Sequence, residues 1–143
     1  MIRLLSFFNT VLLAINTYAQ ISFEKGYYID NNNQKVSCLI KNVDWRNNPT
    51  EFEYKLSEDS QVSSISIDLV KEFGINNTSK YVRALVEIDK SSDNIDELSK
   101  DKNPEFEEAK LFLKVLVEGE ASLFQYRIPN SIRFFYKKDT STI

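Results

Sequence analysis

The strongest constraint on this chain is a hydrophobic period of two that returns in most segments after residue 20. The clearest case is "TEFEYKL" (50–56), in which Phe52, Tyr54 and Leu56 alternate with charged residues. Successive side chains of a strand point to opposite faces of a sheet, so this pattern is typical of a half-buried antiparallel strand. We therefore expect an antiparallel β protein with one solvated sheet face.

The same alternation predicts about nine short strands, separated by turns rich in Asn, Ser, Gly and Pro. Residues expected to face inward are Val36, Cys38, Ile40, Phe52, Tyr54, Leu56, Ile65, Ile67, Leu69, Val82, Ala84, Val86, Ile88, Leu111, Leu113, Val115 and Val117. The predicted fold class is mainly β: an antiparallel meander rolled into a sandwich or small barrel. The order of the strands in space stays open.

One stretch departs from the pattern. Residues 90–109 are charged and almost without alternation. Asp93 or Asn94 would cap a short helix carrying Ile95 and Leu98, and Pro104 would prevent it from continuing. We predict one short helix near residues 93–100 within an exposed excursion.

The N-terminus carries a different signal. Arg3 precedes an apolar stretch over residues 4–15, and Thr17-Tyr18-Ala19 matches a small-x-small cleavage sequence. The predicted organisation is a signal peptide (1–19), a single β-rich domain (20–138) and a frayed tail (139–143). A membrane anchor or a buried helix is the alternative for the first segment. The predicted location is the periplasm or the outer-membrane surface, or outside the cell.

Charge and apolar patterning limit the partners. Loss of residues 1–19 removes only Arg3 among the charges and changes the net charge from −3 to −4. A mildly acidic chain without a basic stripe has no footprint for nucleic acid. No second apolar span follows, so no transmembrane helix is expected in the mature chain. The single cysteine, Cys38, lies in an alternating segment and is expected to be buried.

Composition also limits the chemistry. The chain has no histidine, one cysteine and three glycines. Nucleophile systems that need a histidine base, His/Cys zinc sites and glycine-rich phosphate loops are therefore absent. We predict no cofactor and no enzyme activity. Carboxylates remain, so a glycan hydrolase that uses two of them is the alternative. The candidates are Glu51 and Glu53, Asp89, Asp93 and Asp96, and Glu118 and Glu120.

A weak metal alternative lies at the start of the charged excursion. Asp89, Ser91 and Asp93 have the 1, 3, 5 spacing of a calcium loop. However, the sixth position is Asn94 rather than Gly, and the twelfth is Lys100 rather than Glu. Both departures count against an EF-hand, so the prediction is no metal.

The segment "DWRNNP" (44–49) contains the only tryptophan and forms a loop between two predicted strands. Trp45 either folds back over the end of the sheet or stands in a groove as a binding anchor. The candidate binding residues are those around it and two tyrosines whose neighbours compete for the inward face: Asp44, Trp45, Arg46, Tyr28 and Tyr126.

Several stretches together resemble a known type of exported domain. They are "GYYIDNNNQKVSCLIKNVDWRNNPTEFEYKLSEDS", "VKEFGI", "KYVRALVEIDKSSDNIDELS", "NPEFEEAKLFLKVLVEGEASLFQY" and "RFFYK". The resemblance, over about residues 20–138, is to an uncharacterised β-rich domain of Gram-negative bacteria, often found N-terminal to an outer-membrane β-barrel. It implies export and a β fold but no catalytic residues. This chain stops at Ile143, where longer members continue, so a stand-alone member and a truncated one are both open.

Three functional hypotheses follow. The first is a non-enzymatic cell-envelope domain that binds an envelope protein or a glycan. The second is the carboxylate-dependent hydrolase. The third is a structural module that assembles through exposed strand edges. The ligand and the oligomeric state are not determined by the sequence.

Overall fold

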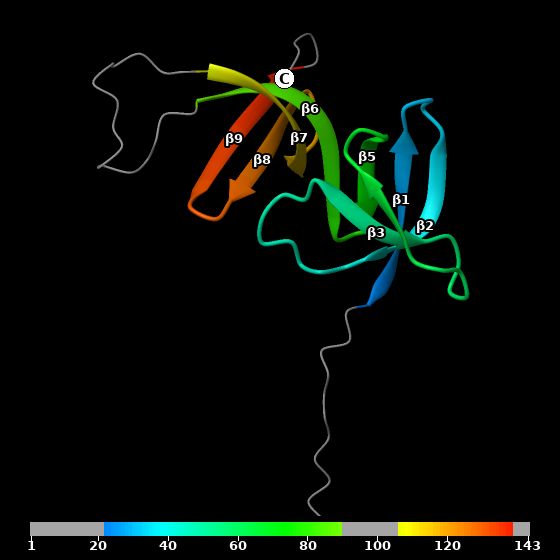
Figure 1. The fold of residues 1–143 in the computed structure, drawn as a ribbon. Helices are drawn as coiled ribbons and strands as arrows, with labels where there is room; N and C mark the ends of the chain where they lie inside the picture. Colours follow the sequence, from blue (N-terminus) through cyan, green and yellow to red (C-terminus); the bar gives the residue numbers. More distant parts are fainter. Residues whose placement is uncertain (1–21, 90–105, 139–143) are drawn as a thin grey trace, which may run out of the picture.

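The computed structural model describes residues 22–89 and 106–138 (Figure 1). These residues form strands and connecting loops. The strands are β1 (Phe23–Asp30), β2 (Lys35–Lys41), β3 (Glu51–Lys55), β4 (Ser63–Ser66), β5 (Val70–Ile75), β6 (Ser79–Asp89), β7 (Phe106–Val117), β8 (Ala121–Ile128) and β9 (Ser131–Lys138). The prediction of a mainly β chain is confirmed. The predicted signal peptide (1–19), the short helix near 93–100 and the tail (139–143) lie outside the described residues.

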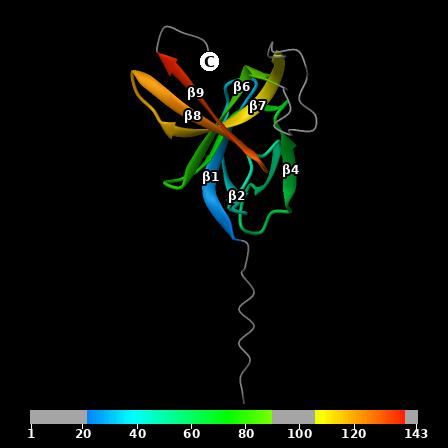
Figure 2. The ribbon, with the colours of Figure 1, turned by 90° about the vertical axis from the view of Figure 1, so that its left-hand side faces the viewer.

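All described strands belong to one antiparallel sheet with the order β4-β3-β2-β1-β5-β6-β7-β8-β9. The sheet is strongly curled and forms a half-barrel (Figures 1 and 2). The predicted sandwich or small barrel is therefore corrected to a single open sheet, with β4 and β9 as its two edges. Within 22–89 and 106–138, the chain has no helix long and apolar enough to span a membrane.

A short turn between β4 and β5 shows why the sheet must curl. These strands stand four positions apart in the sheet, which would be about 19 Å in a flat sheet. Only residues 67–69 connect them, and so short a connection reaches about 14 Å at most. The first part of the sheet therefore bends until β4 returns toward β5. Nη1 of Arg83 on β6 holds this corner by donating to the carbonyl oxygens of Ile67 and Asp68, both at 3.0 Å.

This corner corrects one sequence prediction. The alternation in 62–70 predicts one continuous strand with Leu69 facing inward. The chain instead turns at residues 67–69, where the backbone N–H of Leu69 donates to the carbonyl oxygen of Ser66. Leu69 is 56% exposed as a result. Leu56 and Val117 are also exposed, because each lies just beyond or at the end of its strand.

The sheet has two hydrophobic cores. The first core is built mainly by β1, β2, β3, β5 and the start of β6. Its buried residues are Tyr28, Cys38, Ile40, Phe52, Val70, Phe73, Ile75, Tyr81 and Phe112. The second core is built by β6, β7 and β8, and its buried residues are Ala84, Val86, Leu111, Leu113 and Phe124. The predicted burial of Cys38, Ile40, Ala84, Val86 and Leu113 is confirmed.

The two cores lie on opposite faces of the sheet. On β6, Tyr81 belongs to the first core and the adjacent Val82 packs on the second. On β7, Phe112 belongs to the first core and the adjacent Leu113 to the second. Because neighbouring residues of a strand point to opposite faces, β6 and β7 serve both cores. In a simple sandwich, by contrast, each sheet buries only its inner face.

Two buried tyrosines of the first core predict a loss of stability at alkaline pH. Burial raises the pKa of Tyr81 to about 12, and the negative charge of Asp44 adds to this effect. Burial also raises the pKa of Tyr28 to about 12, with a contribution from its hydrogen bond to Tyr54. An unfolded tyrosine has a pKa near 10. The stability associated with these neutral phenols is therefore full below about pH 10 and is lost as the pH rises toward 12.

We expect the free energy of unfolding in urea to fall between about pH 10 and pH 12, by on the order of 2 kcal/mol for Tyr81 alone. The variant Tyr81→Phe should lose less stability over the same interval. An equal loss in both proteins would show that Tyr81 does not carry this effect.

Candidate functional site

The loop between β2 and β3 leaves the sheet through a local turn. The backbone N–H of Asn42 donates to the carbonyl oxygen of Ser22 at 2.9 Å, and its side-chain oxygen accepts from the N–H of Asp44 at 3.0 Å. Asp44 itself has φ 46°. Asn and Asp favour such turns because their short side chains bond nearby backbone and tolerate positive φ. The turn directs the next residue, Trp45, back toward the sheet.

Trp45 packs edge-on against two aromatic rings of the first core. Its ring centroid lies 5.7 Å from that of Phe73 and 5.6 Å from that of Tyr81. The side chain is half-buried and also lines a groove. The two sequence interpretations of Trp45 are therefore not exclusive: one part of the ring covers the core, and another part faces the groove.

Asn48 fixes the far end of this loop. Its Nδ2 donates to the carbonyl oxygens of Phe112 at 2.7 Å and Gln125 at 2.9 Å, and its Oδ1 accepts from the N–H of Arg127 at 2.9 Å. Its own backbone N–H donates to the carbonyl oxygen of Arg127, also at 2.9 Å. Asn48 thereby connects the β2–β3 loop to both β7 and β8.

These bonds form where β7 and β8 stop pairing and separate, a place that we call the fork. β7 and β8 pair from Lys114 to Val117, and the pairing ends at Gln125 although β8 continues to Ile128. Backbone groups beyond that point lack a strand partner on this side, and such groups are costly to bury unpaired. The Asn48 amide has a donor and an acceptor and fills the fork. Sequence reasoning did not identify Asn48, because nothing in "RNNP" distinguishes it from Asn47.

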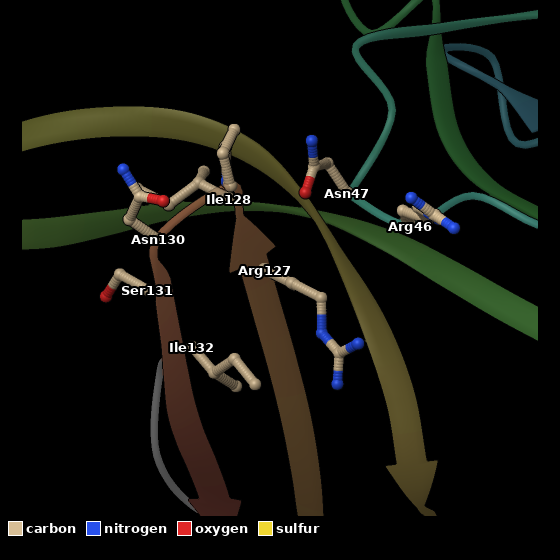
Figure 3. A pocket seen from close by; sticks show the side chains of 8 residues that line it. Arg46, Asn47, Arg127, Ile128, Asn130, Ser131 and Ile132 are labelled. Carbon is tan, nitrogen blue, oxygen red and sulfur yellow. The ribbon is translucent and has the colours of Figure 1, made fainter.

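The loop and the β8–β9 hairpin enclose two adjoining grooves. The loop groove has a volume of about 200 Å³ and is lined by Asp44, Trp45, Arg46, Asn48, Tyr81, Lys114, Gln125 and Arg127. The hairpin groove has a volume of about 620 Å³ and is lined by Arg46, Asn47, Arg127, Ile128, Pro129, Asn130, Ser131 and Ile132. Figure 3 shows Arg46 and Asn47 on the loop side of the hairpin groove and the other labelled residues on the hairpin side. Arg46 and Arg127 belong to both grooves.

The lining of the loop groove carries more positive than negative charge. Arg46, Lys114 and Arg127 line it, and none forms an ion pair with another of the described residues. Asp44 is the single carboxylate of the lining. Uncompensated like charges in one groove repel each other and attract anions. The amides of the two grooves add neutral donors and acceptors beside these cations.

The candidate residues from the sequence divide into two groups. Asp44, Trp45 and Arg46 lie together in the loop groove. Tyr28 is buried in the first core, with its ring centroid 5.3 Å from that of Tyr54, and does not line the grooves. Tyr126 packs against the second core on the other face of the sheet. The cations Lys114 and Arg127 were not predicted, because they reach the groove from distant strands.

The carboxylates proposed for hydrolysis or metal binding are arranged differently. Glu53 forms an ion pair with Lys41, and Glu51 is exposed on the same strand, so the two do not face each other across a cleft. No charged residue is buried in the described part of the chain. Of the calcium alternative, Asp89 ends β6, and Ser91 and Asp93 lie outside the described residues. Residues 22–89 and 106–138 contain no group of three potential metal-ligating His, Cys, Asp or Glu residues.

The unpaired cations lead to a prediction about stability. Replacing all three by glutamine (Arg46→Gln, Lys114→Gln, Arg127→Gln) removes mutual repulsion and breaks no ion pair among the described residues. We expect the free energy of unfolding at low salt to stay the same or to rise by a few tenths of a kcal/mol. Urea unfolding at about 0.02 M and about 0.5 M NaCl measures this, and the difference should vanish at high salt. A loss above about 1 kcal/mol would assign these cations to the fold instead.

A comparison of the chain with protein-family models, with curated proteins and with solved structures finds no match.

Proposed function

We propose that this protein is a non-enzymatic, exported domain of the cell envelope that binds an acidic oligosaccharide in the two grooves beside Trp45. One observation carries the proposal: Arg46, Lys114 and Arg127 line one groove without an ion pair to any described residue. Residues that oppose stability through repulsion are typical of binding sites, where the ligand supplies the missing charge.

The remaining lining fits a carbohydrate better than a simple ion. Asn47, Asn130 and Ser131 place amide and hydroxyl groups along the hairpin groove. Such groups form hydrogen bonds with sugar hydroxyls as donors and as acceptors. The half-buried ring of Trp45 adds aromatic surface to the loop groove. Together, cations, amides and aromatic rings favour an oligosaccharide that carries carboxylate or phosphate groups.

The cations also set the orientation of the ligand. Arg46 and Arg127 are common to both grooves, whereas Lys114 lines only the loop groove. A guanidinium presents a planar fork that bonds a carboxylate or phosphate through two parallel N–H groups. We therefore place an acidic group of the ligand between the two arginines, with neutral sugar hydroxyls along Asn130 and Ser131.

Calorimetric titration with an acidic oligosaccharide, such as an oligogalacturonate, tests this proposal against a neutral glucan oligomer of the same length. The acidic oligomer should bind, and its affinity should fall at least about tenfold in the variant Arg46→Gln/Arg127→Gln. The variant Lys25→Gln/Lys35→Gln is the matched control. It removes two exposed cations from β1 and β2, outside both grooves, and should bind as the unmodified protein does.

Two results would refute the assignment. Equal heats for the acidic and neutral oligomers would exclude recognition of charge. Equal affinities of the two double variants would show that the attraction arises from overall charge and not from the grooves.

A further inference from the structure

The two edges of the sheet differ in how open they are. The turn at residues 67–69 bends the edge strand β4 toward β5 and β6, where Arg83 holds the corner. β9 pairs with β8 on one side, and no other strand of the described chain pairs with it. Every second residue of an antiparallel edge strand directs its N–H and C=O groups away from the sheet. On this side, β9 therefore presents backbone groups that are not paired with any other strand of residues 22–89 and 106–138.

An exposed apolar row follows the same strand. Ile132 is 47% exposed, Phe134 59% and Tyr136 74%. They alternate with Arg133, Phe135 and Lys137, so the row occupies one face of β9. Phe135, on the other face, packs on the second core. Natural edge strands usually place charges where this strand carries large apolar side chains, so the row indicates an interaction surface.

The charge of the hairpin indicates what kind of partner fits. Residues 121–138 contain four cations and no Asp or Glu: the cations are Arg127, Arg133, Lys137 and Lys138. The whole chain has a net charge of −3, whereas this hairpin has a net charge of +4. Pairing β9 with β9 of a second copy would bring two wholly basic hairpins together, which charge repulsion opposes.

We propose that an extended acidic segment of another protein adds to β9 as a tenth strand. Its backbone bonds the free edge, and its side chains alternate between apolar and acidic. The apolar side chains lie beside Ile132, Phe134 and Tyr136. The carboxylates lie on the other face, beside Arg133 and Lys137. This surface shares Ile132 with the hairpin groove, whereas Phe134, Tyr136, Arg133 and Lys137 line neither groove. The inference does not depend on the oligosaccharide proposal.

Synthetic peptides matched to the 8 residues of β9 test this inference. The first alternates glutamate with valine or isoleucine, the second has lysine in place of glutamate, and the third has the residues of the first without alternation. Binding to the full chain is measured by fluorescence anisotropy of labelled peptides and by hydrogen exchange of β9 amides. We expect only the alternating acidic peptide to bind and to protect β9, with weaker binding at about 0.5 M than at about 0.05 M NaCl.

The variants locate the contact. Phe134→Lys, and independently Tyr136→Lys, should lower the affinity for the acidic peptide at least about tenfold. Leu85→Lys is the control, because Leu85 is similarly exposed (54%) but lies on β6, inside the sheet. It should leave the affinity unchanged.

Three binding results would overturn the inference: no binding of the acidic alternating peptide, equal binding of the lysine or non-alternating peptide, or an unchanged affinity in both edge variants. Evidence that something other than a peptide occupies the surface would also overturn it. Vesicles containing phosphatidylglycerol that bind through Phe134 without competition by the peptide would assign the surface to lipid. A dimer in sedimentation that Phe134→Lys dissociates would assign it to a second copy.

Discussion

Replacing Phe73 by alanine is expected to lower the free energy of unfolding by about 3–5 kcal/mol. Phe73 is fully buried, and its ring stacks on Phe52 at 4.2 Å and on Tyr81 at 4.9 Å between centroids. The rings of Phe112 and Trp45 contact it edge-on at 4.9 Å and 5.7 Å. The substitution removes the centre of this cluster and leaves a cavity among the surrounding rings. The loss is comparable to the whole stability of many small domains.

Urea unfolding followed by circular dichroism measures this loss, and the emission of Trp45 gives an independent signal. Trp45 loses one of its two ring contacts, so its emission should move to longer wavelength even under folding conditions. Leu85→Ala, at an exposed position, is the control and should change stability by less than about 0.5 kcal/mol. A loss below about 1 kcal/mol for Phe73→Ala would contradict the packing of the first core described above.

Replacing Asn48 by alanine is expected to lower the free energy of unfolding by about 2–3 kcal/mol. The change leaves the carbonyl oxygens of Phe112 and Gln125 and the N–H of Arg127 without their side-chain partner. These groups are only partly buried, so water replaces some of the lost bonds. The loop would then be joined to β8 by the remaining backbone bond from the N–H of residue 48 to the carbonyl oxygen of Arg127, and the groove beside Trp45 would be held less firmly.

Two further variants separate the role of the amide from the role of the loop. Asn47→Ala, at the adjacent exposed residue, should be close to neutral. Asn48→Asp keeps the acceptor for Arg127 but replaces a donor to two carbonyl oxygens by a negative charge, so it should cost at least as much as alanine. Equal stabilities of Asn47→Ala and Asn48→Ala in urea unfolding would show that the amide does not hold the fork.

The period of the sequence predicted the class of fold, because side-chain alternation depends only on neighbouring residues. It identified Phe52, Ala84, Val86 and Leu113 as inward-facing, and these are buried. It did not predict that the sheet changes its buried face at β6 and β7. There, both Tyr81 and Val82 pack on a core, and a pattern of apolar residues on both faces does not show which core each one joins.

The corner at residues 67–69 was missed for a related reason. Ile65, Ile67 and Leu69 continue the alternation of a strand, and no glycine or proline interrupts it. The turn depends on tertiary contacts, including the bonds from Arg83 to two carbonyl oxygens in it. Tertiary packing therefore overrides the strand propensity of residues 67–69, and such an effect of context is common in strands.

The sequence predicted only some of the residues of the candidate site. The lone tryptophan and its charged neighbours marked the loop, and the structure brings Asp44, Trp45 and Arg46 together there. Lys114 and Arg127 lie more than sixty residues away in the chain and join the site only through the curl of the sheet. Asn48 was not distinguishable from its neighbours, because its importance derives from the end of β7–β8 pairing.

We propose that the cations of the loop groove serve a ligand and not the fold. Trp45 is the only tryptophan of the chain and lines this groove, so its emission reports directly on the site. The most direct measurement is a titration of this emission with an acidic oligosaccharide, for the unmodified protein and for Arg46→Gln/Arg127→Gln. We predict a saturable change that salt weakens and that the double variant lacks. An emission that does not respond, or that responds equally in both proteins, would contradict the claim.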